Sequence, residues 1–402
     1  MDGIRADKVQ AARLERQARL KEELLAALPQ DGEISDDEVR RAAVRVVMDE
    51  HRRGFLTVME RTELCGWLFA TVRGLGVLQT LVDDDDVSEI MVNGKDDVFC
   101  ERRGEMQRWS GSFSSEEELM DTVRQIAGRC DRTVNAQSPI VDARLPDGSR
   151  VNAVVAPAAI NGPILTIRKF PKDALLMEAL IANGAVSREA AEFLRELVER
   201  RYSILIGGGT SAGKTTFLNA LSAFIPKGER IITIEDTAEL SLQGVPNLVR
   251  LEAKAANIEG TAEVTMRDLI KSSLRMRPDR IVVGEVRGGE AVDLLQALNT
   301  GHDGSLSTIH ANSAEDMLSR LEMMVLMAFP LPLPAIRRQI ASGVEALVYL
   351  KRIRGGRRLV TEIAEIEGMD GDAVKINTLF ALDGRGGLVR TGELRHAEKF
   401  GA

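Results

Sequence analysis

A glycine-rich segment in the middle of the chain has the residue types and spacing needed to hold a row of phosphates. It reads Gly208-Gly-Thr-Ser-Ala-Gly213-Lys214-Thr215, that is, glycine, four residues, glycine, lysine and a hydroxyl. Small residues let backbone N–H groups turn inward around phosphates, and the start of a following helix adds its positive end. A strand candidate at 203–206 and a helix candidate at 216–221 flank the segment, as this interpretation requires.

Two side chains of this segment have specific tasks in phosphate chemistry. Lys214 can reach the β- and γ-phosphates of a nucleotide, and the Thr215 hydroxyl can ligate Mg²⁺. A glycine-rich turn that matches by chance is the alternative, and the flanking strand and helix disfavour it. We predict a nucleotide site formed by Gly208, Gly209, Thr210, Ser211, Ala212, Gly213, Lys214, Thr215 and Thr216.

Hydrolysis of a bound nucleotide needs further groups that hold the metal and position a water molecule. Glu285 lies at the end of the strand candidate 280–283, and the carboxyl ends of parallel strands face the ligand crevice. Asp279 cannot share this task, because six residues at about 3.3 Å each place it roughly 20 Å away. We therefore predict a single acid at this strand end.

A second acidic segment follows the strand candidate at 230–234. It runs from Glu235 to Glu239 and holds three carboxylates within five residues. Their mutual repulsion is unfavourable unless a cation or an arginine lies close. A turn whose acids face water is the alternative interpretation. Beside the phosphate-binding segment, we predict that the Mg²⁺ ligands are Thr215, Glu235 and Glu285.

Two of the four histidines fall in one segment around a further strand candidate, 305–309. His310 follows this strand and is predicted at the same crevice, where it can sense the γ-phosphate or relay a change to a neighbouring subunit. His302 is about equally well explained as a residue that braces a loop. Neither has metal-ligand spacing with a cysteine, so zinc is not expected.

The composition is that of an ordinary globular protein, with 402 residues of which 44% are hydrophobic and 28% charged. A net charge of −8 argues against non-specific coating of nucleic acid, which depends on Lys and Arg. No apolar run suits a transmembrane helix, and no signal peptide is recognisable. Three separated cysteines suggest neither disulfides nor zinc. We expect a cytoplasmic protein without direct nucleic-acid binding, whose membrane contact runs through a partner.

The residue pattern divides the chain into three regions. Residues 1–74 are charged and helical, with capping-box spacing from Ser35 to Glu38. Residues 75–172 mix a helix with short strand candidates, including 164–168, which indicates a small α+β domain. From 173 to 402, β-branched strand candidates almost free of charge alternate with amphipathic helices. That pattern predicts the α/β class with a parallel sheet buried on both faces.

Together these motifs resemble the secretion-superfamily ATPases that drive type II and type IV secretion and type IV pili. The resemblance is strongest to the Tad/CpaF branch of pilus-assembly motors, and it spans about residues 75–370. It is carried, in chain order, by Glu89-Ile-Met-Val-Asn-Gly94, Asp142-Ala-Arg-Leu-Pro-Asp-Gly-Ser-Arg150, Thr166-Ile-Arg-Lys-Phe170, the phosphate-binding segment, Thr233-Ile-Glu-Asp236, Arg277-Pro-Asp-Arg-Ile-Val-Val-Gly-Glu285 and Ser307-Thr-Ile-His310.

The resemblance implies a RecA-like P-loop ATPase domain at 173–402, a smaller α+β (PAS-like) domain at 75–172 and a helical extension at 1–74. It implies ATP and Mg²⁺ as cofactors, a homo-hexameric ring, and a platform protein of the inner membrane as partner. Glu285 matches the Walker B glutamate of the family. Glu239 matches the glutamate of its Asp box that is often assigned to water activation, and the choice of general base between these two stays open.

Such ATPases complete their sites with arginines from the N-terminal lobe, either their own or a neighbour's. The matching positions here are Arg144, Arg150 and Arg168. Guanidinium groups suit phosphate oxygens and stabilise charge on a transferring phosphoryl group. Exposed arginines in a charged turn are the alternative. Arg287 is expected either to pair with a nearby acid or to touch the nucleotide.

The leading prediction is an ATP-hydrolysing motor that couples ring motion to the movement of pilin or of a secreted substrate. A nucleic-acid translocase or helicase is the first alternative, although 4% aromatic residues leave few platforms for stacking single strands. A nucleotide-gated scaffold without hydrolysis is the second. Against that scaffold stand three predicted catalytic side chains beside the phosphate-binding segment, Glu239, Glu285 and His310.

Overall fold

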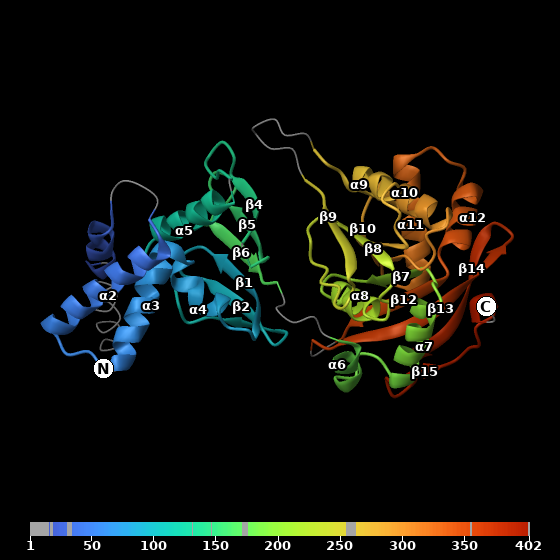
Figure 1. The fold of residues 1–402 in the computed structure, drawn as a ribbon, viewed down its shortest axis with the longest axis horizontal. Coiled ribbons are helices and arrows are strands. Elements are labelled where there is room, and N and C mark those ends of the chain that lie inside the picture. The colour runs from blue at the N-terminus through green and yellow to red at the C-terminus, as the bar shows by residue number, and fades with distance from the viewer. Residues whose placement is uncertain are drawn as a thin grey trace. The chain divides into compact units, whose positions relative to one another are not determined.

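The computed structural model describes residues 16, 19–29, 34–130, 132–145, 147–170, 176–254, 263–353 and 356–400 (Figure 1). The chain divides into two units, Met1–Pro171 and Lys172–Ala402. Within the described residues, no helix combines the length and the apolar character that crossing a membrane would require.

The first unit begins with helices that form a hydrophobic core of their own. A helical stretch at 19–27 packs Leu20 and Leu24 against buried residues of the next two helices, among them Val39 and Leu68. Both of those helices start with a capping box, in which the side chains of residues Ncap and N3 satisfy each other's backbone N–H groups. The predicted box at Ser35 is therefore confirmed. The helical elements are α2 (Asp36–Arg53), α3 (Val58–Arg73), η1 (Gly76–Leu78) and α4 (Gln79–Val82).

The rest of the first unit is an antiparallel sheet with one long helix. The strand order is β3-β2-β1-β6-β5-β4, and every adjacent pair is antiparallel. The helix contributes Leu119, Val123 and Ile126 to a core that also holds Ile90 and Leu165 from the strands. The elements are β1 (Val87–Asn93), β2 (Val98–Arg102), β3 (Glu105–Arg108), α5 (Glu116–Arg129), β4 (Ile140–Arg144), β5 (Arg150–Val154) and β6 (Ile164–Arg168).

The second unit is built on a nine-stranded sheet in the order β15-β14-β13-β12-β7-β11-β10-β8-β9. The six strands from β12 to β9 in that order run parallel, and β13, β14 and β15 extend the sheet in antiparallel fashion. The strands are β7 (Ile204–Gly208), β8 (Arg230–Glu235), β9 (Asn247–Glu252), β10 (Arg280–Val286), β11 (Leu306–His310), β12 (Ala346–Arg352), β13 (Arg358–Asp370), β14 (Ala373–Leu382) and β15 (Leu388–Arg390).

Helices cover both faces of this sheet, as Figure 1 shows. One core contains Leu194, Phe217 and Leu221 from the helices of one face, and a second core contains Leu295 and Leu321 from the other. The predicted α/β class is confirmed. The helices are α6 (Met177–Ala182), α7 (Arg188–Glu199), α8 (Lys214–Ser222), α9 (Met266–Ser273), α10 (Glu290–Leu298), α11 (Ala314–Ala328), α12 (Leu333–Gly343) and the short η2 (Glu398–Phe400).

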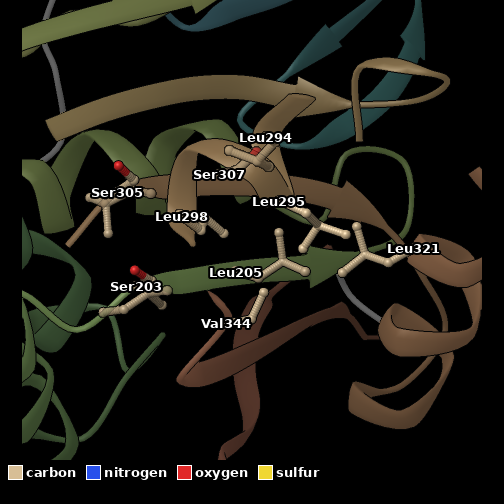
Figure 2. A pocket seen from close by; sticks show the side chains of 11 residues that line it. Ser203, Leu205, Leu294, Leu295, Leu298, Ser305, Ser307, Leu321 and Val344 are labelled. Carbon is tan, nitrogen blue, oxygen red and sulfur yellow. The ribbon is translucent and has the colours of Figure 1, made fainter. Parts of the chain in front are cut away.

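One cavity in the apolar interior of the second unit is too small for a ligand. Figure 2 shows a cavity beneath α10, lined by leucines such as Leu295 and by Ser203 and Ser305, which precede β7 and β11. Its volume is about 10 Å³, roughly the least that can hold one water molecule. This space lies toward the amino ends of β7 and β11, away from the glycine-rich segment that follows β7.

A buried ion pair fastens the amino end of the central strands. Arg280 is fully buried at the start of β10, and its Nε lies 2.5 Å from Glu229 Oε2. The same guanidinium donates to Val198 O at 2.7 Å and to Gly304 O at 3.3 Å. A side chain on Gly304 would come within 2.7 Å of Arg280, so glycine is required there. One arginine thus links helix α7, the β10 strand and the loop before β11.

Replacing Arg280 by Ala should lower the free energy of unfolding of the second unit by about 3–5 kcal/mol, because Glu229 would lose its buried partner. The measurement is denaturant unfolding of the full chain. The control is Arg188→Ala, which removes an exposed pair with Glu178 and should cost less than about 1 kcal/mol. Equal effects of the two substitutions would contradict a structural role for the buried pair.

Candidate nucleotide-binding site

The glycine-rich segment forms the connection from β7 to α8 and wraps the amino end of that helix. Gly213 caps α8 in the left-handed conformation, with φ of +93°, which other residues rarely adopt. A Cβ on Gly208 would lie 2.6 Å from the carbonyl oxygen of Leu350, so the neighbouring strand leaves no space for a side chain. The helix starts at Lys214, two residues before the predicted position, because Gly213 completes the turn.

Lys214 is only 7% exposed and lies inside this loop. Its Nζ donates to the carbonyl oxygens of Gly208, at 3.1 Å, and Gly209, at 3.2 Å. The same ammonium lies 3.4 Å from Glu285 Oε1. The structure thus brings together two predicted site residues that are far apart in the sequence.

Glu285 reaches Lys214 because of the order of the strands. β11 lies between β7 and β10, with His310 opposite Gly208 in the register. His310 Nδ1 lies 2.6 Å from Glu285 Oε1, and Arg287 Nε donates to Glu285 Oε2 at 2.6 Å. Burial raises the pKa of Glu285, but the charges of Lys214 and Arg287 outweigh it and hold the pKa below its ordinary value. Glu285 is therefore a carboxylate at neutral pH.

His310 lies at the centre of this group of charges. Burial lowers its pKa, and the nearby cations of Lys214 and Arg287 lower it further, against the opposing effect of Glu285. Its pKa lies below the ordinary histidine value, so the ring is uncharged at neutral pH. A neutral imidazole can donate one hydrogen bond and accept another.

The acidic segment after β8 is held by its own first residue. Glu235 is 3% exposed, and its Oε2 accepts hydrogen bonds from the backbone N–H groups of Glu239, at 2.7 Å, and Leu240, at 2.8 Å. Burial raises its pKa despite these bonds. Its side chain packs against Gly284, where a Cβ would lie 2.9 Å from Glu235 Cγ. The acidic segment therefore lies next to the strand that carries Glu285.

Arg287 joins the two groups of acids. Its Nη2 lies 2.5 Å from Glu285 Oε2 and its Nη1 lies 3.7 Å from Asp236 Oδ2. Of the two expectations for Arg287, the structure shows pairing with nearby acids. The same guanidinium supplies the cation that the acidic cluster was predicted to need.

The three predicted arginines of the N-terminal region lie on the sheet of the first unit. Arg144 on β4 is directly opposite Arg150 on β5, which is directly opposite Arg168 on β6. Residues opposite each other in a sheet point to the same face. The three guanidinium groups therefore start from one row across three adjacent strands.

The structure also shows the contacts of His302 and Asp279, which the sequence placed outside the phosphate site or left open. His302 Nδ1 contacts the carbonyl oxygen of Ala297 at 3.2 Å, which fits the loop-bracing interpretation. Asp279 accepts a hydrogen bond from the backbone of Arg230 at 2.7 Å, at the start of β8 and β10.

Sequence reasoning missed Arg358, the first residue of β13. Its Nε donates to the carbonyl oxygen of Ser211 at 3.1 Å, and its side chain packs against Gly213. The only local signal is an Arg-rich stretch with two glycines, which does not indicate what it touches. Arg358 holds the tip of the phosphate-binding loop from the antiparallel side of the sheet.

Comparison with known proteins agrees with this geometry. A family model described as type II/IV secretion system protein matches residues 72–368. A relative from Mycobacterium tuberculosis is 38% identical over 304 residues, which are 74% of this chain and 86% of the relative. The type IV secretion system protein PtlH of Bordetella pertussis is 36% identical over 322 residues, covering 73% of this chain and 95% of that protein.

A solved structure shares the fold. The X-ray structure of the ATPase DotB from Legionella pneumophila matches with a TM-score of 0.53 at 19% identity, covering 72% of this chain and 79% of that one. The predicted fold and the predicted resemblance are confirmed. With a family model that spans most of the chain and relatives of this identity, the chain belongs to the family of type II/IV secretion system proteins.

Proposed function

We propose that this chain is the ATP-hydrolysing motor of a machine that assembles a Tad or type IV-like pilus or drives type II/IV secretion. That it is an ATPase follows from its family and its complete phosphate-binding motif. The observation that carries the proposal is the contact of Lys214 with Glu285, which in turn contacts His310 and Arg287. A cation, an ionised acid and a neutral histidine therefore lie together near the carboxyl ends of the parallel strands.

The chemistry required of these residues is mainly positioning and charge stabilisation. Backbone N–H groups of the loop and Lys214 bind the phosphates and offset charge that develops on the γ-phosphate. Glu285 or Glu239 orients the attacking water and accepts its proton. His310 donates its Nδ1–H to Glu285 and so couples the strand that ends beside the phosphate-binding loop to this carboxylate.

The residues present fit a magnesium ion. Mg²⁺ prefers oxygen ligands and is usually held by one or two carboxylates, substrate phosphates and waters. Glu235 Oε1 is buried and has no hydrogen-bond partner among the described residues, although its other oxygen has two. We assign Thr215, Glu235 and Glu285 to hold the ion, which neutralises charge on the β- and γ-phosphates when bound.

The arginine row supports a role in anion binding. The three arginines are in register on one face of the sheet, and guanidinium groups suit phosphate oxygens. Glu89 lies opposite Arg168 on the other side and offsets part of this charge. We propose that Arg144, Arg150 and Arg168 contact nucleotide phosphates from their own or a neighbouring subunit.

The working form that we propose is a homo-hexameric ring at the cytoplasmic face of the inner membrane. Its membrane contact runs through a platform protein, which converts the ring's motion into movement of pilin or substrate. The ionised Glu285 next to Lys214 favours this motor over a scaffold that binds nucleotide without hydrolysis.

Replacing Lys214 by Ala should reduce ATP hydrolysis at least a hundredfold, because the cation that stabilises the transferring phosphoryl group is lost. Phosphate release by the purified full chain is the measurement, with circular dichroism to show that the fold is kept. The control Lys227→Ala removes an exposed lysine of the same unit and should leave the rate unchanged. Normal hydrolysis by the Lys214 variant would refute the site.

Replacing Glu285 by Gln should leave ATP binding within a few-fold and slow hydrolysis by about 10²–10⁴, the usual contribution of a general base. Binding and single-turnover hydrolysis are measured separately. Asp279→Asn, at the other end of the same strand, is the matched control and should keep the wild-type rate. An unchanged kcat in the Glu285 variant would remove this residue from the mechanism.

Action of the arginines across subunits predicts a nonlinear result when wild-type and Arg168→Ala subunits are mixed before assembly. Activity should fall faster than the wild-type fraction, because each variant subunit disables a neighbour's site. Arg124→Ala, which removes an exposed arginine from α5, serves as the control. Activity strictly proportional to the wild-type fraction would argue against contribution from a neighbouring subunit.

A further inference from the structure

A groove of about 630 Å³ lies on the surface of the first unit, between the two helices labelled α2 and α3 in Figure 1. Among the described residues, its lining comes from these helices alone, from positions 40–48 and 58–69. Two lining side chains, Val44 and Val58, are 50% and 70% exposed, so the groove is open to solvent. It lies outside residues 72–368, which the family model matches, so the core that defines the family does not account for it.

The floor of the groove is apolar and lacks a side chain at one point. Ala43 and Val47 of α2 are buried there, and Phe69 of α3 packs against the same core. Gly66 lies in the interior of α3, where glycine is less favourable than alanine, and a Cβ on it would meet no atom within 4 Å. This glycine therefore leaves room for an incoming segment to approach the α3 backbone closely.

A guanidinium group lies at each end of this apolar floor. Arg40 lies over the ring of Phe69, with its Cζ 4.1 Å from the ring centroid. Arg61 lies beside Met48, with its Nη1 3.9 Å from the sulfur, and its buried Nε has no hydrogen-bond partner in the described part of the chain. Neither arginine makes an ion pair with a described residue, and the described lining contains no acidic side chain. The groove therefore presents positive charge that the surrounding helices do not neutralise.

The length and shape of the groove suit one helix. From Arg40 to Met48, α2 advances about 12 Å at a rise of about 1.5 Å per residue, which is just over two helical turns. A helix that docks in such a groove uses apolar side chains at i, i+3 or i+4 and i+7. Acids about two turns apart on the docked helix would reach both arginines. A groove suits a helix better than it suits a membrane surface, into which proteins insert a projecting apolar face.

We infer that the groove between α2 and α3 docks an amphipathic helix of another protein, with acidic side chains beside its apolar face. Charge complementarity selects this occupant, because the chain has a net charge of −8 and yet presents two arginines here. The chain's own residues 1–15 carry three basic and three acidic side chains, so they offer the groove no net negative charge. The inference does not use the nucleotide site and stands independently of the proposed function.

The probe is a synthetic peptide of about 14 residues, stapled into a helix, with leucines on one face and two glutamates about two turns apart beside them. Its dissociation constant for the full chain is measured by fluorescence anisotropy. Gly66→Leu fills the open floor and should weaken binding about tenfold or more. Because leucine favours a helix more than glycine does, the melting temperature should stay the same or rise.

The matched control is Gly128→Leu on α5. Gly128 is also an exposed glycine of a helix in the first unit, and a Cβ on it likewise meets nothing within 4 Å. This variant should bind the peptide as the wild type does. Equal affinities of the wild type and the Gly66 variant would overturn docking in the groove.

Charge reversal tests the arginines separately from the shape. Arg40→Glu combined with Arg61→Glu should weaken binding of the glutamate peptide roughly 5- to 30-fold and should strengthen binding of the same peptide with lysines in place of glutamates. The control is Arg45→Glu, an exposed arginine of α2 that does not line the groove, and it should change neither constant more than about twofold. A wild-type chain that binds both peptides equally would overturn the acidic partner.

The rival occupants give results of their own, and each would overturn a partner helix. If a peptide of residues 1–15 displaces the probe as well as unlabelled probe does, the occupant is the chain's own segment. If Gly66→Leu changes the oligomeric state in sedimentation, the occupant is a second copy of the chain. If the wild type binds vesicles of anionic phospholipid and Gly66→Leu does not, the groove meets a membrane surface.

Discussion

The site depends on one contact, the 3.4 Å approach of the Lys214 ammonium to the Glu285 carboxylate. Lys214 begins the helix that follows β7 and Glu285 lies in β10, and β11 separates these two strands in the sheet. A buried charge without a partner is very unfavourable, so each residue stabilises the ionised state of the other. Their mutual approach also fixes where the phosphate-binding loop lies relative to the acids that follow β8 and β10.

The two ends of the parallel strands differ in the side chains that they carry and in what those side chains do. At the amino ends of the strands, the buried Arg280 pairs with Glu229 and donates to a backbone carbonyl, and these contacts support the fold. At the carboxyl ends of the strands, charged groups are partly exposed, and one buried oxygen of Glu235 has no hydrogen-bond partner among the described residues. Between them, the apolar cavity lined by Leu205, Leu295 and Leu321 has a volume of only about 10 Å³. Rigidity and reactivity are thus separated along the strands.

Local patterns in the sequence were sufficient for the fold class and for the strand ends that carry Glu285 and His310. These patterns depend on spacing and on β-branched runs, which are short-range features. Boundaries were less accurate, as the strand predicted at 203–206 is Ile204–Gly208. Its glycines continue the strand because β11 and β12 pair with them on both sides.

The strand order could not be obtained in this way, and neither could contacts that depend on it. Arg358 contacts Ser211 from a hairpin much later in the chain, and the residues that neighbour either of them in sequence do not indicate this contact. The alignment of the three arginines likewise requires the pairing of β4, β5 and β6. Glu235 was predicted from its charge and its place after the strand candidate at 230–234, whereas its hydrogen bonds to the backbone of Glu239 and Leu240 depend on how the chain turns after β8.

Those two hydrogen bonds have a mechanical consequence. Residues 236–240 have no regular secondary structure, yet the backbone N–H groups of Glu239 and Leu240 are bonded to a carboxylate at the end of β8. The irregular stretch is thereby stiffened by the sheet beneath it. The backbone of Glu239 is therefore anchored to the last residue of β8, so a change in the position of that strand end would also move Glu239.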